Sequence, residues 1–461
     1  MNKKINLAVA GAALALGASA ANAGIVIPAG DWTLDVNGNV NAFMNFNDAD
    51  KAVGTVTGAI ANGQDVLGES DSQGINTGLL PSWLGFTGTT RQNNTDVSFT
   101  ISFQPNASDN TPAGDNKTPL NRQSYLSFGD KSWGSIKLGK DIGIFASGAI
   151  LNDMTLLGVG SGANGRSGAA TTLGGIGTGY IYAAWKGQAT YTTPNMGGFQ
   201  AKVGLMNPNN IPDANTKVTT RTYATTNATT GATAIILGSY CTANVASLSV
   251  TVVSASTVTS TTTHTDTVTG AANGSINQDR FGIEAEASYS WTGDVAGKVW
   301  VSGASYDVTR QTAASTAATP VSQGYDITAF DVGASISAGN FGLVGYYYDG
   351  EGLGTTLFGN NGVTAGGKER DSDGGYVQAT YVIPTGTKVG VAYGVSNLDT
   401  ASGETNANLV EENERWTVGA YHPLTKHLNL VAEYNSTEST NQAGTGNMEN
   451  DSMSLGAILF F

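Results

Sequence analysis

The chain alternates apolar and polar residues with a period of two, and this pattern limits its fold more than any other feature. From Trp32 to Phe46, most even positions are apolar, whereas most odd positions between them are Thr, Asp or Asn. The same alternation recurs at 97–103, 281–291, 389–395 and 453–461. A helix does not produce this period, but a strand with one apolar and one polar face does. Segments of about ten such residues are long enough to cross a membrane as tilted strands.

The connections between these segments alternate in length. Short turns rich in Gly, Pro, Asn and Asp occur at 129–132, 194–198, 292–294, 338–340, 384–386 and 423–426. Long polar stretches separate them, at about 47–79, 105–120, 142–183, 207–278, 307–325, 350–374, 397–413 and 437–450. Short turns on one side and long loops on the other are typical of barrels in the bacterial outer membrane.

The alternating segments predict an all-β fold, a transmembrane antiparallel β-barrel of about 16 strands. Its short turns would be periplasmic and its long loops extracellular. In the segments 297–306 and 341–349, the pattern does not decide the parity, that is, whether the odd-numbered or the even-numbered residues face the lipid. A soluble β-sandwich is the alternative, and it is disfavoured because its inward faces need far fewer polar residues than these strands carry.

The N-terminus has the pattern of an export signal. Lys3 and Lys4 precede a short apolar run, and Ala21-Asn22-Ala23 matches a small-residue cleavage site. The apolar run is too short for a membrane anchor. We therefore predict a cleaved signal peptide at 1–23 and a barrel at 24–461, located in the outer membrane of a Gram-negative bacterium.

Composition excludes several other classes of protein. Charged residues make up 13% of the chain, about half the share in soluble domains. A single cysteine excludes a disulfide scaffold or a Cys-ligated metal cluster. A net charge of −14 with 22 Lys and Arg argues against nucleic-acid binding. No cofactor or metal site is expected, and the three histidines, His264, His422 and His427, lie outside any catalytic pattern.

Several short motifs, taken in order along the chain, resemble the Gram-negative general diffusion porins, a family of sixteen-stranded trimeric barrels. The motifs are Ser82-Trp83-Leu84-Gly85-Phe86, 122–129, 133–140, 191–199, 421–427 and the terminal Phe461. The resemblance covers essentially the whole chain after the signal peptide. It implies a passive channel for ions and small hydrophilic solutes, a homotrimer in outer-membrane lipid, and assembly through Phe461 as the signal read by the barrel-assembly machinery.

The resemblance also implies one loop folded into the lumen as a constriction. Sixteen strands enclose a space too wide for side chains to fill. The third long loop, about 142–183, would fold inward, and it carries one acid, Asp153, and one base, Arg166. The candidate wall cations facing it are Lys140, Lys137, Arg122, Lys186 and Lys202. Trp83 stands where many family members have a wall arginine, and the loop lacks the usual acidic cluster, so we expect a weak transverse field.

Two further expectations concern charges of the wall. Lys140 shares its parity with lipid-facing residues, so we predict that a bulge at Gly139 turns it inward. Without that bulge, Lys137 and Asp141 face the lumen and Lys140 lies at the membrane rim. Glu284, Glu286 and Asp331 have lumen parity and suggest a mild cation preference.

The stretch 207–278 is the least typical part of the chain. Thr and Ser crowd 219–233 and 251–269. The stretch is compatible with a small hairpin over the pore mouth, a trimer-contact loop or an exposed low-complexity loop. An alternative function also stays open, that of a surface-exposed structural, adhesin or receptor barrel with little conductance.

Overall fold

The computed structural model describes residues 24–49, 53–61, 71–105, 107, 120–161, 175, 185–208, 216–223, 264–271, 280–312, 321–364 and 366–461. The predicted signal peptide at 1–23 lies outside them. The chain divides into two compact units, one of Met1–Ala214, Ile276–Arg310 and Gln323–Phe461, the other of Asn215–Ser275 and Gln311–Ser322. No helix in the described part of the chain is long and apolar enough to cross a membrane.

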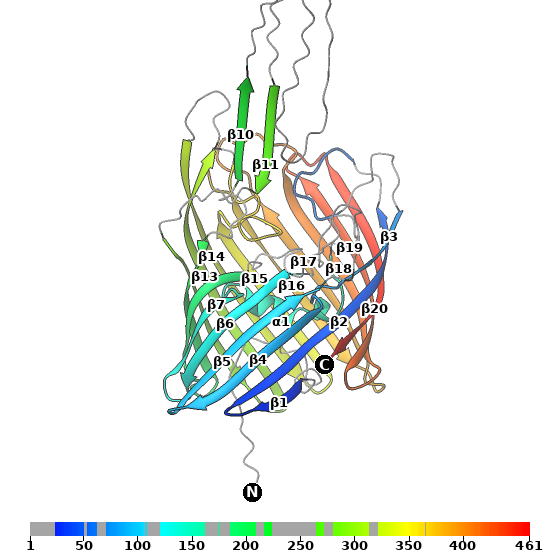
Figure 1. Cartoon of the computed structure of the whole chain (residues 1–461). Coiled ribbons are helices and arrows are strands. Elements are labelled where there is room, and N and C mark those ends of the chain that lie inside the picture. Colours follow the sequence, from blue (N-terminus) through cyan, green and yellow to red (C-terminus); the bar gives the residue numbers. More distant parts are fainter. Residues whose placement is uncertain are drawn as a thin grey trace, which may run out of the picture. The chain divides into compact units, whose positions relative to one another are not determined.

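The first unit is a closed antiparallel sheet (Figure 1). Its strands are β1 (Ile25–Ala29), β2 (Trp32–Ala49), β3 (Asp71–Asn76), β4 (Trp83–Gln92), β5 (Thr95–Gln104), β6 (Leu120–Asp130), β7 (Gly134–Ile142), β8 (Trp185–Thr192), β9 (Phe199–Met206), β12 (Gly282–Trp291), β13 (Val295–Thr312), β14 (Val321–Ala338), β15 (Phe341–Glu351), β16 (Asp371–Val382), β17 (Lys388–Leu398), β18 (Val410–Pro423), β19 (Leu428–Asn441) and β20 (Asn447–Phe460). Neighbours in sequence pair with each other, and β2 closes the barrel by pairing with β20.

These elements fill sixteen strand positions of the described barrel. β3 and β4 pair with successive parts of the same edge of β2, so together they form one interrupted strand. β1 pairs with residues 32–36 of β2, and β20 pairs with residues 39–49 of β2. β1 and β20 therefore follow one another along β2 and count as one strand position. The terminal Phe461 lies at this junction, where its N–H and C=O exchange hydrogen bonds of 3.0 and 2.8 Å with Gly38. The predicted fold class is confirmed.

The two faces of the barrel follow the predicted alternation. On β2, Val40, Met44 and Phe46 are exposed on the outer face, whereas Asn41 and Asn45 are buried inside. In both segments where the parity was ambiguous, the odd positions face outward. The members that show this are Val299, Val301, Leu343 and Tyr347 outside, and Trp300, Ser302, Tyr346 and Tyr348 inside.

Turns and strand lengths show where the sequence pattern was less informative. The β4–β5 turn is made by Asn93 and Asn94, both with positive φ (49° and 62°), which suits a two-residue hairpin. Strands β2, β13 and β14 have 18 residues each, longer than the alternating segments predicted, because they continue into the regions read as loops.

The second unit contains a two-stranded antiparallel hairpin of β10 (Thr216–Tyr223) and β11 (His264–Ala271). It lies within the stretch 207–278. The residues between the two strands, 224–263, which include most of the Thr- and Ser-rich runs, lie outside the described part of the chain.

Candidate pore constriction

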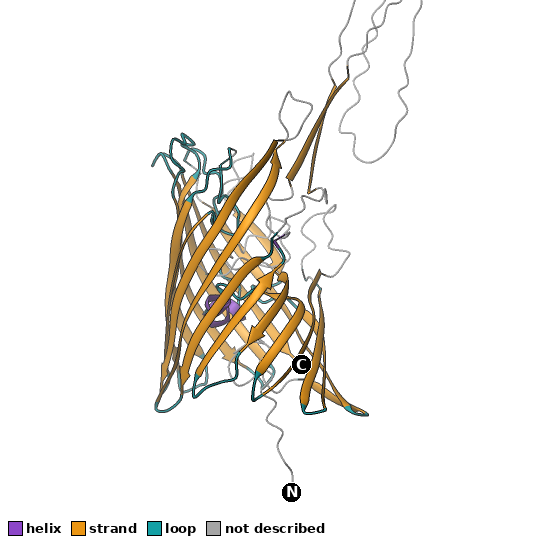
Figure 2. Ribbon diagram, turned by 90° about the vertical axis from the view of Figure 1, so that its left-hand side faces the viewer, coloured by secondary structure: helices purple, strands orange, loops and turns teal. Residues whose placement is uncertain are grey.

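Residues 143–161, here called the inserted segment, follow β7 and lie inside the barrel. They contain α1 (Ser147–Asn152) and the 3₁₀ helix η1 (Met154–Leu157). Figure 2 shows the helix surrounded by strands. Because a short, largely apolar segment has few polar side chains of its own, its backbone N–H groups need acceptors from the wall.

Wall carboxylates supply those acceptors at the start of the inserted segment. Glu284 Oε2 on β12 accepts hydrogen bonds from the backbone N–H groups of Ile144 and Phe145, at 2.6 and 3.0 Å. Asp331 Oδ2 on β14 accepts from Ala146 N at 2.9 Å. Carboxylates that accept from several N–H groups form strong, charge-assisted hydrogen bonds.

The far end of the inserted segment is held in the same way on the opposite strands. Gln378 on β16 accepts from Met154 N at 2.8 Å. Glu433 Oε2 on β19 accepts from Val159 N and Gly160 N at 2.8 and 2.9 Å. The segment therefore spans the lumen from β12 to β19, which is how it narrows the barrel.

Asp153 has a local role in this segment. Its Oδ1 accepts from Thr155 N at 2.8 Å and so caps η1. Its Oδ2 accepts from Gly175 N at 2.9 Å, which joins the inserted segment to a later part of the same loop. The side chain is buried, so it does not face open water as an acid of the constriction. Arg166 lies outside the described residues.

Lys186 and Glu284 form a buried ion pair beneath the inserted segment. The Lys186 ammonium contacts Glu284 Oε1, which also accepts from the Tyr306 hydroxyl at 2.7 Å. The ammonium lies 4.0 Å from the centre of the Phe358 ring. Both charged side chains are almost completely buried, so Lys186 neutralises a structural carboxylate and is shielded from a passing solute.

Three lysines form ion pairs of a different kind, in which the base is partly exposed and the acid is buried. Lys137 lies 2.6 Å from Asp141, and their side chains are 21% and 4% exposed. Lys202 and Lys298 both approach Glu286 Oε1, at 3.2 and 3.6 Å. Those two lysines are 23% and 32% exposed, against 2% for Glu286. The sequence missed Lys298 because the parity of its segment was ambiguous.

The predicted bulge at Gly139 is wrong. The register of β7 runs without a shift past this residue against both β6 and β8. Lys140 therefore stays on the outward face with Leu138, and its ammonium donates to Asn121 O at 2.9 Å. The register shift lies instead in β6, opposite Ser102 and Phe103, where Arg122 is the extra residue.

Arg122 occupies this bulge near the extracellular end of β6. Its guanidinium lies 5.8 Å from the centre of the Trp185 ring. Lys140, whose ammonium donates to a backbone carbonyl on the outer face, thus does not belong to the group of lysines that pair with lumen carboxylates.

A second loop also folds inward, and no pattern in the sequence indicated it. Leu353, Phe358 and Val363, between β15 and β16, are buried in the same cluster as Phe145 of the inserted segment. The loop is fixed by Arg370, whose Nε and Nη2 donate to the two oxygens of Glu404 at 2.8 and 2.6 Å. This guanidinium holds the pKa of Glu404 below its usual range.

Arg415 on β18 is a further lumen cation that the sequence did not single out. It is fully buried, and none of its guanidinium nitrogens has a hydrogen-bond partner within the described ranges. The group lies against Gly175, where a Cβ atom would come within 1.9 Å of Nη2. A side chain at position 175 would therefore require the Arg415 guanidinium to move.

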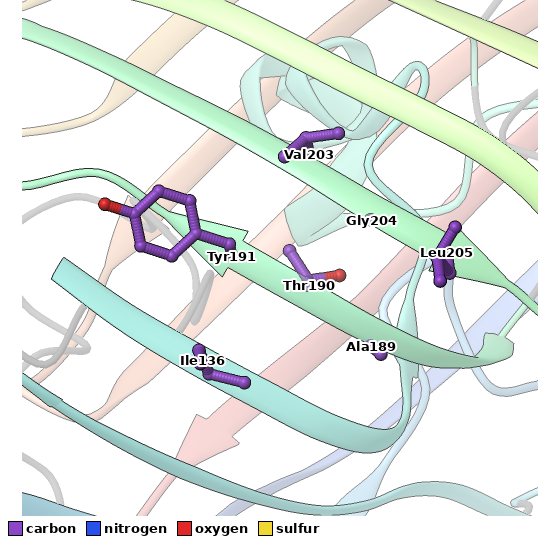
Figure 3. Close-up of a pocket in the computed structure, with 7 residues that line it drawn as sticks. All are labelled: Ile136, Ala189, Thr190, Tyr191, Val203, Gly204 and Leu205. Carbon is purple, nitrogen blue, oxygen red and sulfur yellow. The ribbon is translucent and has the colours of Figure 1, made fainter.

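The outer face has its own depression, of about 230 Å³, over β7, β8 and β9 (Figure 3). Its lining includes Ile136, Ala189, Tyr191, Val203 and Leu205. Because these side chains are apolar and Val203 and Leu205 are exposed, the depression belongs to the lipid-facing surface and not to the lumen.

Comparison with known proteins gives consistent results. The chain matches the family described as Gram-negative porin over residues 8–442. Similar solved structures include the outer membrane channel DcaP of Acinetobacter baumannii (13% identity, 94% of this chain and 99% of that chain, TM-score 0.57). OmpT of Vibrio cholerae is 14% identical, with 95% of this chain and 100% of that chain covered and a TM-score of 0.52. OmpF of Salmonella typhi is 14% identical, with 94% of this chain and 100% of that chain covered and a TM-score of 0.51. No curated protein sequence matches the chain.

Proposed function

Because the chain belongs to the Gram-negative porin family, we propose that it forms a passive, water-filled diffusion channel for ions and small hydrophilic solutes. It is an outer-membrane porin channel of a Gram-negative bacterium and not an enzyme. The observation that carries the proposal is the inserted segment, held across a sixteen-stranded barrel by hydrogen bonds to wall carboxylates. Such an arrangement narrows a lumen that would otherwise pass larger solutes.

The mild cation preference predicted from the sequence loses its support in this geometry. Glu284 and Asp331 are buried acceptors for the inserted segment, and Glu286 is buried between two lysines. A carboxylate screened in this way attracts few mobile cations.

The partners of the channel follow from its class. We propose a homotrimer in outer-membrane lipid, with the C-terminal strand recognised by the barrel-assembly machinery through Phe461. The hydrogen bonds between Phe461 and Gly38 support a role of this residue in closing the barrel. We also propose that residues 1–23 are a cleaved signal peptide, that about 142–183 form the constriction loop and that about 207–278 form an extracellular insertion.

Reconstitution in a planar lipid bilayer tests the function. We expect large, stepwise and weakly voltage-dependent conductance from the purified, folded protein. The second candidate is a surface-interaction barrel with little conductance, which the second inward loop favours because it also occupies the lumen. A barrel that is folded by heat-modifiable gel mobility but silent in the bilayer would exclude the channel and support this alternative.

A further inference from the structure

We propose that Lys202 and Lys298 form an anion-binding site on the lumen wall, for small solutes that carry a carboxylate or another oxyanion, and that this site gives the channel a preference for anions. The inference rests on the proposed channel function. It assigns a solute class that the sequence did not indicate, since the sequence suggested the opposite sign.

The site is built by three neighbouring strands. Lys202 on β9 lies directly opposite Glu286 on β12, and Lys298 on β13 reaches the same carboxylate from the other side. Both ammonium groups converge on one oxygen, Glu286 Oε1, at 3.2 and 3.6 Å. One carboxylate between two ammonium groups leaves a net charge of +1.

The exposed part of this cluster is the cationic part. The Glu286 side chain is 2% exposed, whereas those of Lys202 and Lys298 are 23% and 32% exposed. An ammonium has three donors, and contact with a single carboxylate oxygen leaves others for water or a ligand. A passing oxyanion therefore meets two adjacent donors with their counter-ion hidden behind them.

The surroundings reinforce this asymmetry. Lys137, on nearby β7, also covers a buried acid, Asp141. Among the described acids at lumen-facing strand positions, Asp35 on β2 and Asp96 on β5 are not buried. Asp96 is paired with Arg91 at 2.6 Å, and β6, β7, β8 and β9 separate its strand from β12. Asp35 lies on β2, which is half of the strand order away from β12, so it does not neutralise the site.

Reversal potentials in a KCl gradient test the site directly. We expect the wild-type channel to pass chloride more readily than potassium. The double variant Lys202→Gln with Lys298→Gln should lower the chloride-to-potassium permeability ratio about two- to four-fold, because a charge close to the path changes the local ion concentration by about two-fold. Glu286→Gln should raise the ratio, since it removes the buried counter-ion.

Matched variants separate charge from structural effects. Lys140→Gln removes a lysine of the same barrel from the outward face and should leave the ratio unchanged. The pair Lys202→Arg with Lys298→Arg keeps both charges and should keep the preference. Lys298→Gln alone preserves the Lys202–Glu286 pair, and so provides a folded intermediate if the double variant does not assemble.

Liposome swelling extends the test to solutes. Gluconate should enter proteoliposomes faster than expected from the rate for glucose, a neutral probe of similar size, and the double glutamine variant should lose that advantage. A conducting wild type that prefers potassium, or a double variant with unchanged selectivity, would refute the anion site but leave the channel function intact. A folded but silent barrel would refute the channel function itself.

Discussion

Glu284 and Glu286 lie two residues apart on the same face of β12, yet they serve different parts of the molecule. Glu284 is covered by the inserted segment, accepts two of its N–H groups and neutralises the buried Lys186. Glu286 lies beyond the segment and binds two lysines that stay in contact with water. A lumen-facing acid thus becomes part of the structure or part of the permeation path according to what covers it.

The covered region should lose the most stability when its charge balance is broken. Glu284→Gln leaves the Lys186 ammonium buried without a counter-ion, and we expect a loss of about 3–5 kcal/mol in the free energy of unfolding. Guanidinium chloride unfolding of the folded barrel, followed by gel mobility, measures this change. Glu286→Gln is the matched control. It should lower the free energy of unfolding far less, because its two partners, Lys202 and Lys298, are partly exposed to water.

The double variant Lys186→Met with Glu284→Gln sharpens this test. It removes both charges, so much of the lost stability should return. Equal losses for Glu284→Gln and Glu286→Gln would show that coverage by the inserted segment does not separate the two acids.

The other end of the covered region should respond more weakly. Glu433→Ala removes the acceptor of Val159 N, Gly160 N and the Tyr421 hydroxyl. We expect a cost of about 1–3 kcal/mol, together with noisier and larger single-channel currents as the segment loosens. Glu438→Ala on the outward face of the same strand should show neither effect, since it faces Glu414 and Glu449 and makes no contact with the segment. Unchanged currents in Glu433→Ala would contradict the anchoring role.

The features that the sequence predicted well are local. Strand number, strand parity and most turns depend on period two and on turn residues, which can be read within a few positions. Whether the inserted segment covers a wall residue is not a local property, because Glu284 and its partner Ile144 are separated by 140 residues in the chain. For this reason the sequence assigned Glu284 and Glu286, by parity, and Lys186, by the family resemblance, alike to the pore lining, and it did not distinguish covered from open positions.

The errors have equally specific causes. The bulge was expected at Gly139 because of the family resemblance and because glycine tolerates that geometry, but the register shift occurs at Arg122, in the pairing of β6 with β5. The buried apolar side chains of the second inward loop, Leu353, Phe358 and Val363, are too few and irregularly spaced to form a pattern. Arg415 was overlooked because a lone arginine in a strand carries no motif.

The ion pair of Arg370 and Glu404 is a third kind of charged contact, because it lies in the extracellular loops and away from the inserted segment. Glu404→Gln should cost about 1–2 kcal/mol in the free energy of unfolding, because it removes the charge from a largely buried pair, 7% and 11% exposed, but keeps one oxygen as an acceptor. Because Arg370 lowers the pKa of Glu404, the stabilisation is complete above the ordinary value of about 4.3 and is lost as the pH falls through the lowered pKa. Hydrogen exchange of residues 399–409, corrected for intrinsic rates, should therefore accelerate at acidic pH in the wild type. A similar acceleration in Glu404→Gln would assign the effect to another group.

The smallest change in stability is expected at the partly exposed lysines outside the inserted segment, here called the open lysines: Lys137, Lys202 and Lys298. Substitution of an open lysine should change ion selectivity instead. Lys137→Gln removes an exposed partner of Asp141, so its cost should stay below about 1 kcal/mol. The change uncovers Asp141, whose carboxylate then keeps, among the described residues, the hydrogen bond from Gln123 at 3.1 Å. The reversal potential in a KCl gradient should therefore shift toward potassium while the unfolding midpoint stays near that of the wild type. Lys140→Gln, three residues along the same strand on the outer face, should change neither quantity. If Lys137→Gln instead unfolds the barrel without altering selectivity, the open lysines stabilise the wall in the same way as Lys186, and the distinction between covered and open charges fails.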